Sequence, residues 1–185
     1  MIKLETDRLE LKNGSETEPS PEAIEQGYQR YMEGHEDPSC PFDVFRTEIL
    51  FSYFQAKKNI PYGHFNIFPK GTDTTVGHCG LGLRFCDPAE RNLIAGDRQA
   101  RAVHAGLEMD VGWAVMKDHR NQGFATEAAQ CVVDYFFASY NLERIIASTD
   151  RHNGASQRVM EKLGMRLCRH QNGVGITGVL ENPQS

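Results

Sequence analysis

A strand, a glycine-containing loop and a helix are predicted one after another over residues 107–140, and this run constrains the fold more than any other part of the chain. Apolar residues alternate with charged or small ones over 107–116, which is the pattern of a strand with one apolar face. A polar segment ends in Gly123, and apolar residues at helical spacing continue from Phe124 to Tyr140. The change from a period of two to a period of about 3.6 residues across a short loop predicts a mixed α/β domain.

The rest of the chain alternates between the same two kinds of element. We expect strands over residues 6–12, 63–68, 75–85 and 144–149, and a closing hairpin of 165–169 with 174–180. We expect helices from Pro21 to about residue 32, over 43–57 and over 155–163, the last capped by Asn153 and ended by Gly164. Residues 87–105 mix charged and small side chains, so they fit either a short helix on a long connection or a mobile loop near a binding site.

The 185 residues are 39% hydrophobic and 24% charged, which is typical of a globular protein long enough to bury a full core. We find no repeat, linker or low-complexity tract, so residues 1–185 are expected to form a single domain. The formal net charge is -5. Nucleic acids and anionic membranes attract proteins with a positive field, so this charge argues against both as partners, although a local basic patch for one small anionic ligand is compatible with it.

The cysteines and histidines give no sign of a disulfide framework or a metal site. The five cysteines are odd in number and contain no CxxC pair, and the seven histidines are scattered. The first 20 residues lack an apolar signal-peptide core, and no run of 18 apolar residues occurs. We therefore expect a soluble, cytoplasmic protein without a metal, in which Cys79, Cys86, Cys131 and Cys168 are small core residues.

The segment Arg120-Asn121-Gln122-Gly123-Phe124-Ala125 fits the pattern Arg/Gln-x-x-Gly-x-Gly/Ala between the predicted strand and helix. Such a loop leaves several backbone amides without partners at a helix start, where the helix dipole favours an anion. Gly123 lets the backbone approach a ligand, Ala125 keeps the helix entrance small and Arg120 adds positive charge. Each contact of this kind is worth about 0.3–1 kcal/mol, so several amides together suffice to hold a pyrophosphate. The alternative is an ordinary helix cap.

The order of the motifs resembles the GNAT acetyltransferase superfamily. Asp110-Val111-Gly112-Trp113 precedes the loop, Thr126-Glu127-Ala128 opens the helix, and Asn153-Gly154-Ala155-Ser156 is followed by Val159-Met160-Glu161-Lys162-Leu163-Gly164-Met165. The second block is similar to the branch that contains ribosomal-protein N-terminal acetyltransferases, as are Thr6-Asp7-Arg8-Leu9-Glu10-Leu11 and Gly77-His78-Cys79-Gly80-Leu81. The resemblance covers nearly the whole chain. It implies a GNAT-like α/β fold with a central, mostly antiparallel twisted sheet of about six to seven strands, flanked by helices on both faces.

By this resemblance the protein transfers an acetyl group from acetyl-coenzyme A to a primary amine, which attacks the thioester directly. The backbone of Arg120, Asn121, Gln122, Gly123, Phe124, Ala125 and Thr126 is expected to hold the pyrophosphate of the coenzyme. The strand at Val111, Trp113 and Val115 is expected to pair with the pantetheine arm, and one of its amides to polarise the thioester carbonyl. A donor in that position is worth about 10²–10³ in rate. Gly112 suits a position where the strand bulges or is approached closely.

The acceptor amine requires a base. A lysine-like amine has a pKa of about 10.4 and is mostly protonated at neutral pH, so a carboxylate must take its proton directly or through water. Asp110 and Glu108 lie two residues apart on one face of the predicted strand. We expect Asp110 to be the base, with Glu108 as the second candidate; many relatives carry Glu where this chain has Asp110. The alternative is a solvated strand face with two acidic residues.

The leaving thiolate requires a proton or a hydrogen bond, and in the resembled branch the serine of Asn-x-x-Ser approaches the sulfur. This makes Ser156 the candidate donor and Asn153 a residue that binds the coenzyme arm. Asn153 also fits an N-cap, and the two roles can coexist. For Ser156 the alternative is a first-turn serine that hydrogen-bonds to its own backbone. Tyr140 is not at the position of the tyrosine that other superfamily members use.

Several other functions are weighed against acetyl transfer. Residues 173–178 read Gly-x-Gly-x-x-Gly, but the helix that a dinucleotide-binding loop requires does not follow, and no GxxxxGK[ST] segment occurs. A coenzyme A-binding regulatory or interaction domain without turnover stays open, because Asp110 stands where Glu is commoner. The expected partner is an amine acceptor, either a small molecule or a protein N-terminus, and the acidic residues of 20–60 suit a cationic group. A homodimer is compatible with the sequence.

Overall fold

The computed structural model describes residues 2–13, 20–34, 63–96, 106–140, 142–170 and 173–183. Its contacts separate the chain into two compact units, the first made of Met1–Gly80 with Trp113–Ala128 and the second of Leu81–Gly112 with Ala129–Ser185. The predicted helix over 43–57 and the later part of the 87–105 connection lie outside the described residues. The single domain expected for residues 1–185 stays a prediction.

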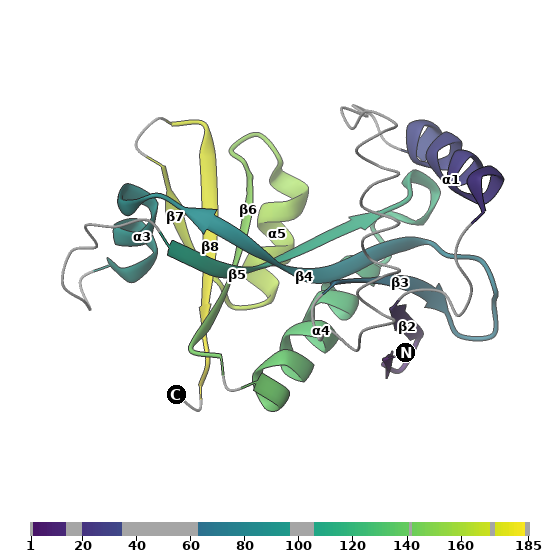
Figure 1. The fold of residues 1–185 in the computed structure, drawn as a ribbon, viewed down its shortest axis with the longest axis horizontal. Helices are drawn as coiled ribbons and strands as arrows, with labels where there is room; N and C mark the ends of the chain where they lie inside the picture. Colours follow the sequence, from purple (N-terminus) through teal and green to yellow (C-terminus); the bar gives the residue numbers. More distant parts are fainter. Residues whose placement is uncertain are drawn as a thin grey trace. The chain divides into compact units, whose positions relative to one another are not determined.

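The first unit contains strands β1 (Lys3–Glu5), β2 (Leu9–Asn13) and β3 (Gly63–Pro69), and β2 pairs antiparallel with both of the others (Figure 1). Leu11 of β2 lies opposite Ile67 of β3, and both side chains are buried. The alternating apolar positions of these strands therefore supply one face to a core. Other buried residues of this unit are Leu9, Phe65, Val76 and Ile24, the last from helix α1 (Pro21–Gly34), which begins at the predicted proline.

The strand predicted over 6–12 starts later than expected. The Thr6 N–H donates to the Leu9 carbonyl at 3.0 Å, so residues 6–8 form a turn between β1 and β2. The sequence pattern does not predict β1 at all, because its three residues are too few for an apolar alternation to be recognised. The N-terminal segment is thus a hairpin rather than a single strand.

Two long strands and one helix belong partly to each unit: β4 (Gly77–Cys86), β5 (Gly106–Val115) and α4 (Phe124–Tyr140). All three elements were predicted, and α4 has the predicted bounds. In the first unit, a side chain on Gly77 would collide with the carbonyl of Ala114, so the glycine permits the close approach of β4 and β5. A 3₁₀ turn (Lys117–His119) follows β5 before the loop that leads into α4.

The second unit contains β6 (Arg144–Asp150), β7 (Arg166–Arg169) and β8 (Gly175–Glu181). Strand β8 lies between the other two and pairs antiparallel with each, which confirms the predicted closing hairpin (Figure 1). Strand β5 joins β6 in parallel, and the register places Asp110 opposite Ile146. Because residues 175–178 form part of β8, the Gly-x-Gly-x-x-Gly match belongs to a strand, as predicted.

Helices α3 (Pro88–Ala95) and α5 (Gly154–Lys162) of the second unit begin at side-chain caps. Asp87 accepts a hydrogen bond from the Glu90 N–H at 2.8 Å, so the 87–105 connection opens with a helix. Asn153 accepts one from the Ser156 N–H at 3.0 Å, which confirms its predicted capping role. Gly164 follows α5 with a φ of 77°, the left-handed conformation that favours glycine at a helix end.

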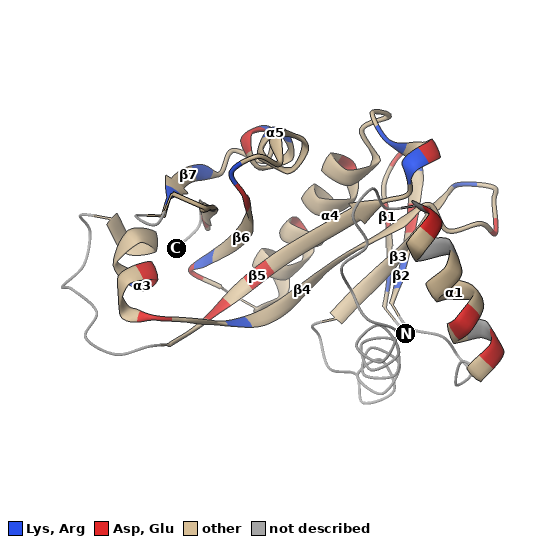
Figure 2. Ribbon diagram, turned by 90° about the horizontal axis from the view of Figure 1, so that it is seen from above, with Lys and Arg blue, Asp and Glu red and all other residues tan. Residues whose placement is uncertain are grey.

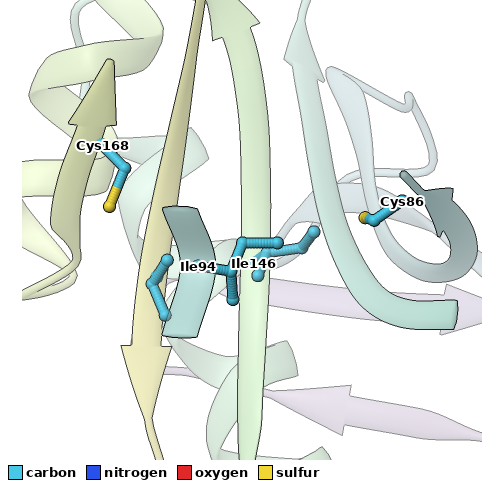
Figure 3. Packing of buried hydrophobic residues seen from close by; sticks show 5 residues of the cluster. Cys86, Ile94, Ile146 and Cys168 are labelled. Carbon is cyan, nitrogen blue, oxygen red and sulfur yellow. The ribbon is translucent and has the colours of Figure 1, made fainter. Parts of the chain in front are cut away.

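A buried cluster joins α3 to the strands of the second unit (Figure 3). It contains Cys86, Ile94, Ile146, Cys168 and Val179, which come from β4, α3, β6, β7 and β8. Burial raises the pKa of the Cys86 thiol to about 11, so this thiol stays protonated at neutral pH. Cys79 is buried as well, whereas Cys131 is half-buried, and the four cysteines are free thiols. The prediction of core cysteines is confirmed for the three buried ones.

The strand pairing gives one sheet in the order β1-β2-β3-β4-β5-β6-β8-β7. Within the described ranges it has eight strands where about six or seven were expected, and the additional strand is β1. With helices α1, α3, α4 and α5 in the described part of the chain, the protein has the predicted mixed α/β fold. None of the helices in the described residues is long and apolar enough to cross a membrane.

Candidate active site

Asp110, the expected base, lies on β5 in the second unit and contacts an arginine of β4. Its Oδ2 atom is 2.6 Å from Nε of Arg84. The same guanidinium group reaches α3, where its Nη2 atom is 2.7 Å from Oε1 of Glu90. Figure 2 marks acidic positions on β5 and α3 in red and the basic position on β4 in blue. The Asp110 side chain is 21% exposed, so it is largely withdrawn from water but not sealed off.

The environment of Asp110 changes its acidity. Burial raises the pKa of its carboxyl from 3.8 to about 6, although the positive charge of Arg84 opposes this rise and the negative charge of Glu90 adds to it. The carboxyl is therefore mainly ionised at neutral pH and is a stronger base than an exposed aspartate. General-base catalysis is most efficient when the pKa of the base lies near the working pH.

Glu108, the second candidate, is bound through both oxygens by Arg144 of β6. Arg144 Nε donates to Oε2 at 3.0 Å and Nη2 donates to Oε1 at 2.8 Å, while Nε of Arg91 lies 4.0 Å from Oε1. The Glu108 side chain is only 7% exposed. A carboxylate held in this bidentate way is a buried ion pair. A solvated strand face with two acids is therefore wrong, because Glu108 is buried in this ion pair.

The prediction that Leu107 begins the apolar face of β5 is also wrong. Leu107 was assigned to that face, but it is 61% exposed, whereas the neighbouring Glu108 is buried. The reason is the ion pair with Arg144, which makes burial of the carboxylate possible. The alternation holds at Val111, which is buried.

Glu90 connects Arg84 to a second group of polar side chains. Its Oε1 atom accepts a hydrogen bond from Thr177 Oγ1 at 3.2 Å, in addition to the one from Arg84. Nε2 of His170 lies 2.8 Å from Thr177 Oγ1 and 3.6 Å from Glu90 Oε1. Arg84 is thus held between two carboxylates, and Glu90 is itself fixed by residues of the closing hairpin. This arrangement orients the guanidinium group that contacts Asp110.

The loop between β5 and α4 lies in the first unit and has the features of an anion-binding loop. Asn121 and Gly123 adopt left-handed conformations, with φ values of 61° and 85°. The first helical hydrogen bond runs from Glu127 N–H to the Gly123 carbonyl at 3.0 Å. The amides of 124–126 therefore lie in the first turn of the helix, and backbone N–H groups in a first turn have no acceptor within the helix. Because residues 121–123 are exposed, the donor set suits a phosphate group.

Arg120 fixes the beginning of this loop to the end of β5. Its Nε atom donates to the carbonyl of Val115 at 3.1 Å, and its backbone N–H donates to the Lys117 carbonyl at 3.3 Å. The predicted strand position Trp113 is half-buried in the same unit. In the second unit, no atom of the described chain lies within 4 Å of the point that a Cβ on Gly112 would occupy. The strand backbone is therefore open to close approach at Gly112.

The start of α5 carries the remaining candidates. Asn153 is exposed and caps the helix, whereas Ser156 is partly buried in the first turn. The Ser156 backbone N–H donates to Asn153 Oδ1 at 3.0 Å, and its hydroxyl makes no hydrogen bond to any residue that the structure describes. The structure thus leaves the hydroxyl available to another acceptor.

The predicted site residues divide between the two units. Glu108, Asp110, Val111, Asn153 and Ser156 belong to the second unit, whereas Trp113, Val115 and residues 120–126 belong to the first. Within the described ranges, no group of three or more His, Cys, Asp or Glu side chains is arranged to hold a metal ion.

The sequence analysis missed the residues that surround these candidates: Arg84, Glu90, Arg91, Arg144, Thr177 and His170 around the acids, and Thr6, Arg8 and Glu127 at the loop. A partial signal exists for Arg84, the only charged residue in the apolar strand β4. Thr6, Arg8 and Glu127 occur in motifs that carry the family resemblance, but nothing in those motifs shows that they meet.

The acetyltransferase (GNAT) domain family matches residues 19–166 of the chain. YnaD, an uncharacterised N-acetyltransferase of Bacillus subtilis (strain 168), is 46% identical over 57 residues, which are 31% of this chain and 34% of YnaD. The chain thus spans about a third of the length of that relative. YjdG, an uncharacterised N-acetyltransferase of the same organism, is 29% identical over 177 residues, which are 90% of this chain and 91% of YjdG.

The solved structures show the same fold. The ribosomal L7/L12 alpha-N-protein acetyltransferase RimL, solved in complex with coenzyme A, superposes with a TM-score of 0.68 over 100% of both chains, at 12% sequence identity. This likeness concerns the fold, and the match over residues 19–166 concerns the family. The chain therefore belongs to the GNAT acetyltransferase family.

Proposed function

We propose that this protein transfers an acetyl group from acetyl-coenzyme A to a primary amine and that Asp110 is the general base. The observation that carries the proposal is the environment of Asp110, a largely buried carboxyl on β5 with a pKa of about 6. The family supports the donor, since GNAT acetyltransferases use acetyl-coenzyme A and the RimL structure contains coenzyme A. The acceptor is a peptide N-terminus or a small-molecule amine.

The loop before α4 would hold the pyrophosphate of the donor. Its amides precede the helical ladder, and the left-handed residues Asn121 and Gly123 shape the backbone around them. Arg120 supports the loop through its bond to the Val115 carbonyl. When bound, acetyl-coenzyme A supplies an activated thioester. Residues 111–115 would pair with the pantetheine arm through the strand backbone, and one of their amides would stabilise the oxyanion.

Asp110 would remove the proton of the acceptor ammonium, directly or through a water molecule. The freed amine nitrogen then forms a bond to the acetyl carbon, and the bond from that carbon to sulfur breaks. A positioned base of this kind contributes about 10²–10⁴ in rate. Arg84 keeps the carboxyl ionised before the acceptor arrives, and Glu90 holds Arg84 in place.

Ser156 would donate a hydrogen bond to the leaving thiolate and relay to it the second proton that the attacking nitrogen loses as the amide forms. Its hydroxyl is not engaged with the described residues, and its backbone N–H is fixed by the Asn153 cap. Asn153 is exposed beside this turn, so its amide nitrogen remains available to the coenzyme arm. The two residues would therefore act on the donor from the start of α5.

Release of free thiol from acetyl-coenzyme A tests this proposal. The full chain is incubated with the donor and a panel of small amines and N-terminal peptides, and thiol is followed with a colorimetric reagent. We expect turnover with at least one acceptor, and a decrease in kcat of about 10²-fold or more for Asp110→Asn. Asp73→Asn, the same substitution at an exposed turn residue, is the matched control and keeps wild-type kcat.

Two results would count against the proposal in different ways. Coenzyme A binding without turnover on any acceptor would identify a regulatory or interaction domain instead. If Asp110→Asn keeps wild-type kcat while turnover is present, the protein is an acetyltransferase but its base is another group.

A further inference from the structure

The turn before β2 contacts the phosphate-binding loop through Arg8. In the first unit, Arg8 Nη1 donates to the Gln122 carbonyl at 3.1 Å, and Nε donates to Glu127 Oε2 at 2.7 Å. The guanidinium carbon lies 5.1 Å from the centre of the Phe124 ring, a cation–π arrangement. A Cβ on Gly123 would be 3.3 Å from Nη2 of the same arginine. A single side chain thus contacts the loop and the first turn of α4.

The backbone around Arg8 is fixed to the core, so this contact has a rigid base. Thr6 Oγ1 donates to Glu127 Oε1 at 2.5 Å and accepts hydrogen bonds from the N–H groups of Leu9 at 2.9 Å and Arg8 at 3.3 Å. Leu9 is completely buried in β2. The Arg8 N–H donates to Glu127 as well, at 3.2 Å. The turn of residues 6–8 is therefore held between a core strand and the first turn of α4.

Arg8 compensates the negative charge of Glu127. The carboxylate of Glu127 lies in the first turn of the helix whose leading amides would bind a phosphate. Burial acts to raise the pKa of Glu127, but hydrogen bonds from Thr6 and Arg8 and the charge of Arg8 lower it below its ordinary value, so the group is ionised at neutral pH. An uncompensated carboxylate there would repel a second anion. Arg8 Nη2 is 2.5 Å from Glu127 Oε2, and this ion pair cancels the charge.

We propose that Arg8 is a positioning residue for the donor: it fixes the carbonyl of Gln122 and compensates Glu127, so that the loop keeps both its shape and its positive field. The inference rests on the proposed function, because the ligand concerned is the pyrophosphate of the acyl donor. It assigns Arg8 no contact with the reacting atoms. Loss of Arg8 therefore weakens binding of pyrophosphate-containing donors and leaves the chemical step unchanged.

The test compares acetyl-coenzyme A with S-acetylpantetheine, a truncated donor that lacks the pyrophosphate. For Arg8→Gln we expect KM for acetyl-coenzyme A to rise about 10-fold, with unchanged kcat and unchanged kcat/KM for the truncated donor. Arg8→Lys keeps the charge but loses the two-pronged geometry, so it recovers only part of the loss. Arg169→Gln, at an exposed arginine of β7, is the matched control and keeps the wild-type KM.

A double mutant separates the electrostatic contribution from the geometric one. Glu127→Gln removes the charge that Arg8 compensates, so adding it to Arg8→Gln should restore part of the affinity for acetyl-coenzyme A. Equal weakening of both donors by Arg8→Gln would overturn the inference, as would a lower melting temperature with an unchanged KM, because either result assigns Arg8 a general structural role.

Calorimetric titration with coenzyme A keeps the inference distinct from the proposed function. If the wild type binds coenzyme A but has no turnover, the enzymatic proposal fails, while an approximately 10-fold higher Kd for Arg8→Gln still supports the role of Arg8. If Arg8→Gln binds coenzyme A with the wild-type Kd, the positioning role is wrong whether or not the protein is an enzyme.

Discussion

Replacement of Asp110 by Asn removes a carboxyl that is costly to ionise, so we expect Asp110→Asn to be more stable than the wild type at neutral pH although it loses activity. The carboxyl is largely buried, and its pKa stays near 6 in spite of the ion pair with Arg84. Its ionised form is therefore less favourable in the folded protein than in the unfolded chain. Asparagine has a similar shape and never ionises.

The size and pH dependence of this effect follow from the two pKa values. The folded-state pKa, about 6, lies above the ordinary value of 3.8, so the folded protein binds more protons between these values. The contribution of Asp110 to wild-type stability is consequently most favourable below pH 3.8 and decreases as the pH rises towards 6. A rise of about two pKa units corresponds to about 3 kcal/mol of unfolding free energy. Between about pH 5 and pH 8, the unfavourable contribution of ionised Asp110 to the unfolding free energy grows by about 1.4 kcal/mol.

Urea unfolding followed by circular dichroism between pH 5 and 8 measures the difference. The unfolding free energy of Asp110→Asn minus that of the wild type should increase with pH, whereas Asp73→Asn should follow the wild type at every pH. A variant whose advantage does not grow with pH, or that is less stable than the wild type at pH 8, would refute the reasoning, because burial would then not dominate the energetics of Asp110.

Three further predictions concern the neighbours of Asp110 and the loop. The pH profile of kcat/KM should rise with an apparent pKa of about 6, and Arg84→Gln should move this limb to higher pH, because the charge that favours the carboxylate is lost; an unmoved limb would contradict this. Glu108→Gln should reduce the unfolding free energy by about 3 kcal/mol in urea titrations, since Arg144 keeps a buried charge without its partner, whereas wild-type stability would show the pair to be dispensable. Gly123→Ala should cost about 1 kcal/mol in the same titrations and raise KM for acetyl-coenzyme A, because φ is 85° there; an unchanged KM would show that the loop tolerates the side chain.

The elements that sequence analysis predicts best are those with a long periodic signal. Strand β5 and helix α4 each have enough residues for a period to be read, and the caps Asn153 and Gly164 lie at positions where few residue types suit the backbone. Strand β1 could not be predicted in this way, because its three residues are too few to show a period. The residues of the sequence motifs could likewise be predicted, because each motif forms a loop or turn within a few consecutive residues.

The partners of the site residues could not be predicted, because they come from distant parts of the chain. Arg144 is 36 positions from Glu108, and Arg8 is 119 positions from Glu127. Such pairs follow from strand order and register, which the residue pattern does not contain. The exposed Leu107 illustrates the consequence: the alternation alone assigns it to the buried face, and only the arginine from β6 explains why Glu108 is buried instead.

The two carboxylates of β5 acquire different roles because they meet different arginines. Arg144 donates a hydrogen bond to each oxygen of Glu108, so neither oxygen of that carboxylate is left without a protein partner. Arg84 is shared between Oδ2 of Asp110 and Glu90, and the other oxygen of Asp110, Oδ1, accepts no hydrogen bond from the described residues. Asp110 therefore combines an available oxygen with a pKa of about 6, which is the combination that the proposed general base requires. The strands on either side of β5 thus give its two acids different surroundings, and this difference is the basis for proposing Asp110 as the base.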